Sequence, residues 1–451
     1  MKIGLIAMSG VRVVNAELNR VGVTLPGFVE RSKVIASLPS LSLLTLAALT
    51  PADIDVDYRE IAELSDPFTL PDDYDLVAIS SFTAQANESY RVADHYVARG
   101  VPVVMGGLHA TVMPEEVRAH GATVAIGEGE LTWPRVLEDF RHGALRDEYR
   151  PPPGRWCDLA EAPMPRFELL DLERYNRLTV QTTRGCPWRC EFCASSILLT
   201  PKYRVKPVET VVAEIRKIRD LWEHPFIEFA DDNSFVAKYH ARQLLGALRD
   251  ERIKWFTESD VSVADDLELL DLMRASGCRQ VLIGLESPDA PGLDGLELRR
   301  NWKLGRLPDY EAAVRRIQSR GITVNGCFVL GLDGHGPDVF DRVYDFVARS
   351  GLYEVQLTVM TAFPGTPLYQ RLKQEGRLIE ERAWNKCTLF DVNHIPTGMT
   401  PEALQQGLID LARRIYDPGF VEERRRRFFR ELKGGRVIAH ALAHEESSYE
   451  T

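Results

Sequence analysis

Three cysteines set close together in residues 182–196, Thr-Thr-Arg-Gly-Cys-Pro-Trp-Arg-Cys-Glu-Phe-Cys-Ala-Ser-Ser, constrain this chain more than any other feature. Cys186, Cys190 and Cys193 form a Cys-x3-Cys-x2-Cys array directly after an apolar run. Thiolates at this spacing usually bind a metal centre, and an iron–sulfur cluster is the first candidate. Three thiolates can bind three irons of a [4Fe–4S] cluster, which leaves the fourth iron open to a ligand that is not protein.

A zinc site and a disulfide framework both fit the array less well. A zinc site usually has four ligands, but no histidine lies in the array and the remaining cysteines, Cys157, Cys278, Cys327 and Cys387, are isolated from one another. A disulfide framework is disfavoured because the cysteine count is odd, at 7, in a chain of 451 residues that begins without a secretory signal. The array therefore favours a cluster.

Composition narrows the class of protein. A length of 451 residues and a hydrophobic content of 45% predict two or three domains with sizeable cores. The net charge of −11 argues against a nucleic-acid partner and would suit a cationic substrate. No apolar stretch reaches membrane-spanning length. We expect a cytoplasmic enzyme that keeps its thiols reduced and binds neither nucleic acid nor membrane.

Residues 1–145 alternate strand and helix patterns. Apolar strands are expected at 3–8, 54–58, 76–82, 101–105 and 122–126, with helices near 41–49, 87–99 and 132–141. This pattern predicts an α/β domain with a doubly wound parallel sheet, whose ligands lie beyond the carboxyl ends of the strands. Two of those ends are rich in glycine, Gly106-Gly107-Leu108-His109 and Gly127-Glu128-Gly129-Glu130.

A second alternating region follows a proline-rich linker, which we place at 146–175. Between 176 and 395, strands are expected at 178–182, 226–229, 254–258, 280–285, 323–330 and 354–359, each but the last followed by an amphipathic helix. Residues 396–451 read as helical, beginning with a helix over 401–416 after a cap at Thr400.

With this organisation the chain resembles the radical S-adenosylmethionine (SAM) superfamily. Cys186, Cys190 and Cys193 match its cluster motif one by one, and Phe192 precedes the third cysteine as it often does there. The six strand–helix units resemble the partial (β/α)6 barrel of that family's core. The resemblance implies a [4Fe–4S] cluster whose open iron chelates SAM. One electron then cleaves SAM to a 5′-deoxyadenosyl radical, which removes a hydrogen atom from the substrate.

The N-terminal region resembles the cobalamin-binding domain found in one branch of the superfamily. Its marks are Ser-Ser-Phe-Thr-Ala-Gln at 80–85 and the two glycine-rich turns. The Asp-x-His-x-x-Gly motif that supplies histidine to cobalt in many such domains is missing, since Ser9-Gly10-Val11-Arg12-Val13 stands in its place. Two interpretations stay open, a cobalamin bound without that histidine or an inherited fold that binds none. We expect His95 at the surface and His109 packed at its turn.

Candidate site residues follow the second and third barrel strands. Asp231-Asp232-Asn233 stands where family members hydrogen-bond the SAM ammonium, although adjacent acidic residues also cap helices. Glu258 ends the third strand and would be a costly buried charge unless it pairs with a substrate or a cation. We take Glu258, Asp231 and Asp232 as candidates for substrate binding or proton transfer, and a structural ion pair is the alternative for Glu258.

The later strands carry further resemblances. Glu286 and Ser287 match a family motif that meets the ribose and methionine parts of SAM. Gly326, Phe328 and Gly331 match the glycine-spaced strand that lies against adenine. The C-terminal region covers the open barrel in family members, so that Asn385, Asn393 and His394 are expected near the substrate.

Two radical reactions compete. In one, the substrate radical attacks methylcobalamin and the product is C-methylated. In the other, cobalamin takes no part and the radical loses a neighbouring hydroxyl as water. The missing histidine motif and the acidic charge favour dehydration, and the whole chain resembles the radical SAM diol dehydratases of apramycin-type aminoglycoside biosynthesis. That resemblance implies a lyase acting on a cationic amino sugar without bound cobalamin. It also implies an electron donor of the flavodoxin or ferredoxin type and a separate NAD(P)H dehydrogenase. A cluster protein for electron transfer or sensing is the non-enzymatic alternative.

Overall fold

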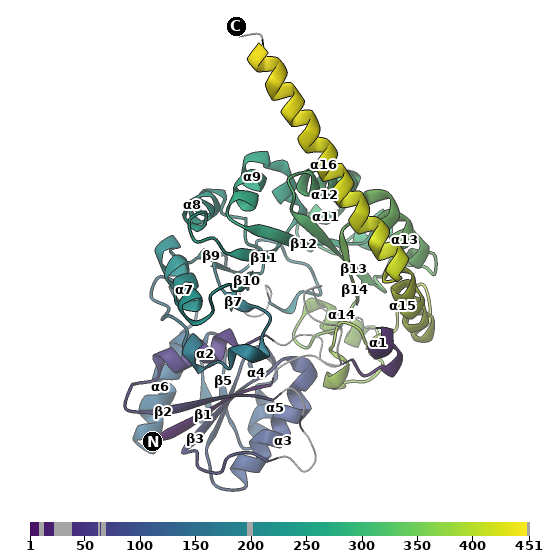
Figure 1. Cartoon of the computed structure of the whole chain (residues 1–451). Helices are drawn as coiled ribbons and strands as arrows, with labels where there is room; N and C mark the ends of the chain where they lie inside the picture. Colours follow the sequence, from purple (N-terminus) through teal and green to yellow (C-terminus); the bar gives the residue numbers. More distant parts are fainter. Residues whose placement is uncertain (9–12, 22–37, 62–63, 65–68, 196–201, 449–451) are drawn as a thin grey trace.

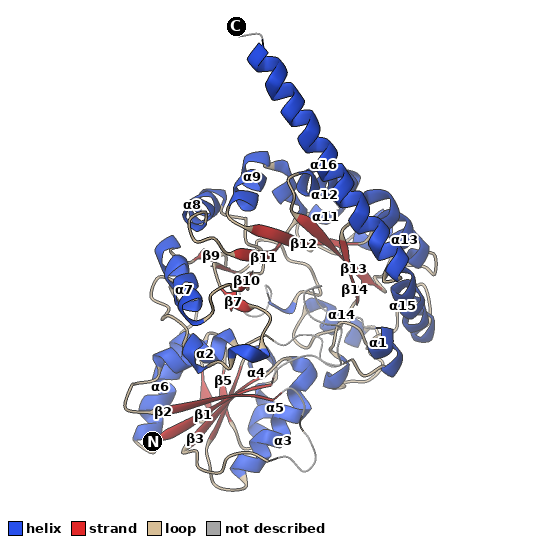
Figure 2. Cartoon of the chain, in the orientation of Figure 1, coloured by secondary structure: helices blue, strands red, loops and turns tan. Residues whose placement is uncertain are grey.

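The computed structural model describes residues 1–8, 13–21, 38–61, 64, 69–195 and 202–448. Two six-stranded parallel sheets organise these residues, and helices pack against both sheets (Figures 1 and 2). The sheets follow each other along the chain, and a helical region ends it. The α/β fold class expected from the sequence is confirmed.

The N-terminal sheet has the strand order β2-β1-β3-β4-β5-β6. Its strands are β1 (Lys2–Met8), β2 (Asp55–Ile61), β3 (Leu76–Ser80), β4 (Val103–Gly106), β5 (Thr123–Ala125) and β6 (Glu148–Tyr149). The order reverses between β1 and β3, because β2 lies on one side of β1 and all later strands lie on the other. In sheets of this kind ligands bind at the carboxyl ends of the strands beside this reversal.

Helices cover both faces of the N-terminal sheet. On one face, Leu43 and Trp133 pack in one cluster with Ile3 and Leu5. On the other face, Tyr90 and other apolar side chains pack against the reverse sides of the same strands. The first face is covered by α2 (Leu41–Leu49) and α6 (Gly129–Arg141), and the second by α3 (Ala86–Val97), α4 (Leu108–Val112) and α5 (Pro114–Ala119).

The second sheet, called the barrel sheet below, has the order β14-β13-β12-β11-β10-β7. Its strands are β7 (Leu178–Val180), β10 (Phe226–Phe229), β11 (Lys254–Ser259), β12 (Cys278–Glu286), β13 (Thr323–Leu330) and β14 (Glu354–Val359). Consecutive strands pair in parallel, which is the arrangement of a (β/α)6 partial barrel. The helices outside it are α7 (Val208–Leu221), α8 (Lys238–Leu248), α9 (Leu267–Ala275), α12 (Tyr310–Ser319) and α13 (Val339–Ser350) (Figure 1).

The two faces of the barrel sheet differ in chemistry. Successive side chains of a strand point to opposite faces. One set is apolar and packs toward the helices, for example Trp255, Ile283 and Leu357. The alternate set faces the barrel interior and includes Glu258 and Gln356. The interior is therefore polar, which is unusual for a parallel sheet that helices cover.

The remaining helices and strands lie outside the two sheets. They are α1 (Ala16–Val21), the short antiparallel strands β8 (Thr183–Arg184) and β9 (Arg204–Val205), α10 (Ala290–Leu293), α11 (Trp302–Arg306), α14 (Pro367–Gln374), α15 (Pro401–Ile415) and α16 (Pro418–Ser448). Helix α16 extends beyond the rest of the molecule in Figure 1. None of the helices in the described ranges combines the length and apolar character that crossing a membrane requires.

Two short segments depart from the expected organisation. Strand β6 extends the N-terminal sheet past residue 145, where we expected a linker. The sequence did not reveal this strand, because two residues are too few to show a periodic pattern. Helix α1 packs against α15, and the backbone N–H groups of Val14 and Asn15 donate to the Asp391 carboxylate at 2.9 Å. The first 21 residues therefore supply β1 to the N-terminal sheet and also contact the C-terminal region.

Gly277 allows the chain before β12 to lie close to the chain before β11, because it has no Cβ. Its φ of +105° disfavours other residues, and a Cβ there would lie 2.0 Å from the Ile253 carbonyl oxygen. We expect Gly277→Ala to lower the free energy of unfolding by about 2–5 kcal/mol, from backbone strain and overpacking together. Gly100 is the matched control, since its φ is +75° and nothing lies within 4 Å. Gly100→Ala should cost only about 1–2 kcal/mol in urea unfolding. Equal costs would contradict this account.

Candidate active site

The three cysteines of the array lie in residues 185–195, called the cysteine loop below, directly after β8. Cys190 is buried, while Cys186 and Cys193 are partly exposed. The Cys193 N–H donates to the Cys190 carbonyl at 3.0 Å. Burial raises the pKa of Cys186 to about 11 and that of Cys190 to about 12. A bound metal centre reverses this effect, because it stabilises the thiolates.

The spacing of the thiols distinguishes between kinds of metal centre. In the described part of the chain, no three His, Cys, Asp or Glu side chains are close enough to hold one metal ion. A cluster makes a different demand, because each thiolate binds a different iron. The three thiols are near enough that Cys186 and Cys193 both raise the pKa of Cys190. The ligand role of the three cysteines stays a prediction.

Asp231 fixes the turn that leads from β7 into the cysteine loop. One carboxylate oxygen accepts from the N–H groups of Thr182 and Thr183 at 2.7 and 2.9 Å. The other accepts from the Thr182 hydroxyl at 2.5 Å and the Ser234 hydroxyl at 2.8 Å. Burial raises the pKa of Asp231. With four hydrogen bonds the carboxylate is engaged in shaping this turn, and nothing in its contacts supports the proton-transfer role we expected.

Asp232 holds the loop itself. Its carboxylate accepts from the Gly185 N–H at 2.8 Å and from the Ser195 hydroxyl. Gly185 and Ser195 are the two ends of the cysteine loop, so that one side chain clamps them together. Asp232 can act here as a support for the loop, and its expected roles in SAM binding and catalysis stay predictions.

Asn233 lies beside the first cysteine. Its Nδ2 is 3.8 Å from the Cys186 sulfur and donates to Asp260 at 2.8 Å. The Trp188 indole N–H donates to the same Asp260 carboxylate at 2.8 Å. Sequence patterns did not reveal Asp260 or Trp188, because neither residue belongs to a spaced motif. Asn233 is the predicted cofactor-binding residue that comes nearest to a cysteine sulfur by a measured contact.

Glu286 is held by a lysine that the sequence did not reveal. Lys303, on α11, donates to Glu286 at 2.5 Å and to the Gly284 carbonyl at 2.8 Å. Burial opposes the charge on Lys303, but the neighbouring Glu286 carboxylate raises its pKa, and Cys190 acts in the same direction. This buried pair therefore lies next to the cysteine loop. A contact between Glu286 and SAM stays a prediction.

Ser287 directly follows β12, and its hydroxyl already has two partners. Its side chain is fully buried, donates to Asp289 at 2.9 Å and lies 2.9 Å from the His335 Nε2. A contact between Ser287 and SAM stays a prediction.

The β13 residues also face away from the barrel interior. The Phe328 ring packs against Phe346 of α13, with ring centroids 5.7 Å apart. A Cβ on Gly326 would contact Leu352, and a Cβ on Gly331 would contact Leu404. These are contacts of the helix-covered face, so that the backbone of this strand, and not the Phe328 ring, is the part that can face a ligand in the barrel. The contact of Gly326, Phe328 and Gly331 with adenine stays a prediction.

Two of the three C-terminal residues expected near the substrate, Asn393 and His394, are buried and contact the backbone, and their role at the substrate stays a prediction. The Asn393 side chain accepts from the Ala362 N–H at 3.1 Å, and the buried His394 ring lies 3.2 Å from the Gly331 carbonyl. Asn385 is exposed. Phe192 is half-buried and packs against the main core of the barrel.

Glu258 is the one predicted catalytic carboxylate that faces the barrel interior unengaged. Its side chain has no hydrogen-bond or ion-pair partner among the residues the structure describes. The side chain of Glu258 is partly buried. Burial and the charges of Glu228 and Asp232 raise the pKa of Glu258 to about 8. At neutral pH this carboxyl group is mainly protonated and can donate a hydrogen bond.

The carboxyl ends of β3 and β4 form a second candidate site. Phe82 is 61% exposed there, which is unusual for a large apolar side chain. Thr83 is buried, and its hydroxyl has no hydrogen-bond partner within the described ranges. Gly107 is partly exposed at the same edge and has a φ of +93°, which favours glycine. An exposed aromatic ring, a glycine turn and a hydroxyl without a partner fit a large flat cofactor such as cobalamin.

The two histidines considered from the sequence contact other side chains. The His109 ring is buried, lies 2.9 Å from the Tyr90 hydroxyl and packs against Trp384. His95 lies beside Asp72 at 3.6 Å. The position of the missing histidine motif, residues 9–12, lies outside the described part of the chain.

A buried ion network joins the two candidate sites. Arg184, two residues before Cys186, donates to Glu128 and Glu130 at 2.7 Å each. Arg204 donates to Glu128 at 2.7 Å as well. Burial acts against the charge on Glu128, but its hydrogen bonds with Arg204 and Arg184 keep its pKa below the ordinary value. The carboxyl end of β5 is thereby fixed to the strand that enters the cysteine loop.

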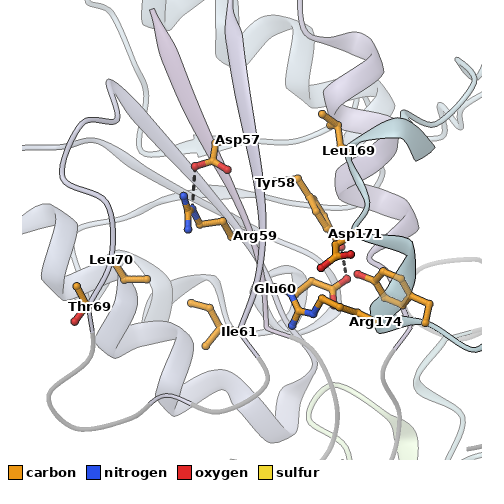
Figure 3. Close-up of a pocket in the computed structure, with 11 residues that line it drawn as sticks. Asp57, Tyr58, Arg59, Glu60, Ile61, Thr69, Leu70, Leu169, Asp171 and Arg174 are labelled. Carbon is orange, nitrogen blue, oxygen red and sulfur yellow. Dashed lines mark hydrogen bonds and ion pairs between the residues drawn. The ribbon is translucent and has the colours of Figure 1, made fainter.

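A cavity of about 390 Å³ lies elsewhere. It is bordered by the edge strand β2 and by residues 169–175, with Tyr58, Glu60 and Arg174 in its wall (Figure 3). None of the predicted site residues lines it. We assign it no part in the active site.

The raised pKa of Glu258 predicts a pH-dependent stability. The ordinary glutamate pKa is 4.5, so that the folded protein binds this proton more tightly than the unfolded chain, and stability falls as pH rises from about 4.5 to about 8. Glu258→Gln removes the titration. Its melting temperature should exceed that of the wild type by more at pH 8 than at pH 5. The exposed Glu209 gives the control Glu209→Gln, which should show the same difference at both pH values. A pH-independent effect of Glu258→Gln would contradict the assignment.

Comparison with known protein families gives three matches along the chain. The B12 binding domain matches residues 34–137, the Radical SAM superfamily matches 180–347, and a domain of unknown function, DUF4070, matches 366–445. The B12 binding domain match covers β2 to β5 of the N-terminal sheet, and the Radical SAM match covers most of the barrel sheet.

Two relatives match most of the chain. An uncharacterized methyltransferase of Synechocystis sp. is 30% identical over 411 residues, covering 88% of this chain and 74% of the relative. The bacteriochlorophyllide d C-12(1)-methyltransferase of Chlorobaculum tepidum is 28% identical over 397 residues, covering 86% and 84%. Both are named as methyltransferases. They overturn our expectation of a diol dehydratase and of a lyase, and the amino-sugar substrate and the separate dehydrogenase that went with it lose their support.

Solved structures share the fold. The radical SAM methyltransferase TsrM of Kitasatospora setae, solved with cobalamin and a [4Fe–4S] cluster, has a TM-score of 0.63 at 16% identity, covering 83% of this chain and 78% of TsrM. The cobalamin-dependent SAM radical enzyme OxsB has a TM-score of 0.66 at 16% identity, covering 90% and 65%.

The expectation that cobalamin is absent was wrong. The B12 binding domain match and these cobalamin-bound neighbours overturn it, because the missing histidine motif excludes only one way of holding the cofactor. The chain belongs to the radical SAM superfamily, in the cobalamin-dependent branch that carries a B12-binding domain before the radical SAM domain.

Proposed function

We propose that this protein is a cobalamin-dependent radical SAM methyltransferase that methylates a carbon atom of a small molecule. The buried network of Glu128, Glu130 and Arg184 carries the proposal, because it sets the end of the B12-type sheet against the cysteine loop. Two cofactor sites that must act on one substrate need such a fixed junction. The names of the two relatives supply the reaction type.

The chain's residues would divide as follows. Cys186, Cys190 and Cys193 would hold the cluster, and the turns after β3, β4 and β5 would hold cobalamin. When bound, the cluster supplies the electron that cleaves SAM to the hydrogen-abstracting radical, and cobalamin supplies the methyl group. Asp231 and Asp232 keep the cysteine loop in shape, and the pair of Glu286 and Lys303 supports it from the side of β12.

The barrel interior indicates the kind of substrate. Asn325 is fully buried, and neither its amide oxygen nor its nitrogen has a partner in the described residues. The Gln356 amide nitrogen is also buried and has no hydrogen-bond partner in the described residues. Leaving such groups unpaired is costly, so that a bound molecule with hydrogen-bonding groups would stabilise them. Glu258 lies on the same face of the barrel sheet, on β11. We therefore propose a polar substrate, and we propose that an external one-electron donor of the flavodoxin or ferredoxin type reduces the cluster.

Metal content tests the proposal before the substrate is known. Protein purified anaerobically with hydroxocobalamin should retain close to one cobalt and about four irons per chain. Replacing Cys186, Cys190 and Cys193 by Ala should remove the iron and leave the cobalt. Gly107→Val adds a branched side chain to the turn after β4, where cobalamin would bind. This variant should lose the cobalt and keep the iron. Iron without cobalt in the wild type would contradict the proposal. Candidate small molecules can then be screened for products heavier by one CH2 unit.

A further inference from the structure

We propose that Arg189, Leu298, Arg299 and Arg300 form the docking patch for an acidic one-electron carrier. The inference rests on the proposed function, because only a redox centre on the cysteine loop needs a partner that delivers electrons. The patch lies beside residues 189–191 of that loop. Its positive charge and the need for an electron indicate the partner, an acidic one-electron carrier.

The backbone places these residues together although they are far apart in sequence. The Leu298 N–H donates to the Arg189 carbonyl at 2.9 Å, and the Glu191 N–H donates to the Leu296 carbonyl at 3.0 Å. Between these two bonds, Cys190 pairs with Glu297 as an antiparallel bridge. The middle cysteine of the array therefore lies directly behind the patch.

Glu297 holds the patch in one shape. Its carboxylate is 3% exposed and accepts from the N–H groups of Arg189 at 3.2 Å, Arg299 at 3.2 Å and Arg300 at 2.7 Å. Burial works against its charge, but these backbone hydrogen bonds keep the pKa of Glu297 below the ordinary value. The acid is thus occupied by backbone groups and forms no ion pair with the three guanidinium groups.

The arginine side chains of the patch are uncompensated. Across the described residues, Arg189, Arg299 and Arg300 form no ion pair. The two acidic neighbours are engaged elsewhere, since Asp294 accepts from Asn301 and Glu191 pairs with Arg371. Arg299 and Arg300 are exposed, and Leu298 is 49% exposed among them. An exposed apolar side chain ringed by positive charge is typical of a protein-binding surface.

Charge and distance both favour this patch as the entry point for an electron. The chain as a whole carries −11 and repels an acidic carrier, so that a local positive surface decides where such a carrier meets it. Electron transfer weakens steeply with distance, and the Cys190 backbone lies just beneath. The step moves one electron from the carrier to the cluster site, and no bond or proton changes place.

Charge reversal at the patch tests the inference on the reconstituted holoenzyme. The double variant Arg299→Glu/Arg300→Glu should bind oxidised flavodoxin at least about tenfold more weakly in a thermophoresis titration, because two attractions become repulsions. With reduced flavodoxin as donor, its formation of 5′-deoxyadenosine from SAM should slow by a similar factor. With titanium(III) citrate, a small reductant that needs no docking surface, its rate should equal that of the wild type.

The matched control is Arg249→Glu/Arg252→Glu. These two arginines are also exposed and without an ion pair among the described residues, and they precede β11, at the opposite end of the strands from the cysteine loop. This control should bind and use flavodoxin like the wild type. Equal weakening in both double variants, or no weakening at the patch, would overturn the proposal. Failure of every protein to form 5′-deoxyadenosine with titanium(III) citrate would instead reject the proposed function, while the binding titration would still test the patch.

Discussion

The hydrogen bonds of one buried carboxylate, Asp231, determine how the rest of the site is arranged. They tie the end of β10 to the chain that leaves β7, and that chain becomes the cysteine loop two residues later. Parallel strands end at one edge of a sheet, so that a side chain after one strand can fix the loop after its neighbour. Asp232 and Asn233 continue the same pattern, one at the ends of the loop and one beside Cys186. Side chains at the end of β10 therefore hold the cysteine loop in its shape.

Charged contacts hold this loop from three further directions. Arg184 fixes it to the N-terminal sheet, Glu297 fixes it to the segment before α11, and Glu191 fixes it to α14 through Arg371. Buried ion pairs of this kind add little net stability, because desolvation offsets much of the attraction. Their value here is geometric, since chemistry between a cluster and a second cofactor depends on small distances. The polar barrel interior also favours a defined position for a bound molecule, because the side-chain amides of Asn325 and Gln356 have polar atoms without a partner in the described residues.

Much of the fold was open to prediction from the sequence, and parts of the site were not. Apolar runs at strand spacing identified all six barrel strands, since each is buried by helices on one face. The Asp-Asp-Asn run and Glu258 could be placed at strand ends from the sequence, and their roles stay predictions. The packing of Ser287 and Phe328 could not be foreseen, because a motif gives the position in sequence but not the face of the strand. Lys303, Asp260 and Glu297 were missed because they act on the loop from distant segments.

The reaction was misjudged for a different reason. A missing histidine motif was read as a missing cofactor, and a negative charge was read as a preference for a cationic substrate. Neither observation constrains the chemistry, because cobalt can be held without that histidine and net charge reflects the surface of the whole chain. The structure gives the better indication of a cobalamin site, because Gly107 has a positive φ and Phe82 is exposed at the same edge of the sheet.

The central claim is that the preformed cysteine loop carries a four-iron cluster with one iron open to SAM. Electron paramagnetic resonance of the anaerobically reduced protein, recorded before and after addition of SAM, tests it most directly. We expect the signal of a reduced [4Fe–4S] cluster whose g values change when SAM binds. A cluster signal that SAM leaves unchanged would contradict the claim, and so would a protein that takes up zinc and shows no signal.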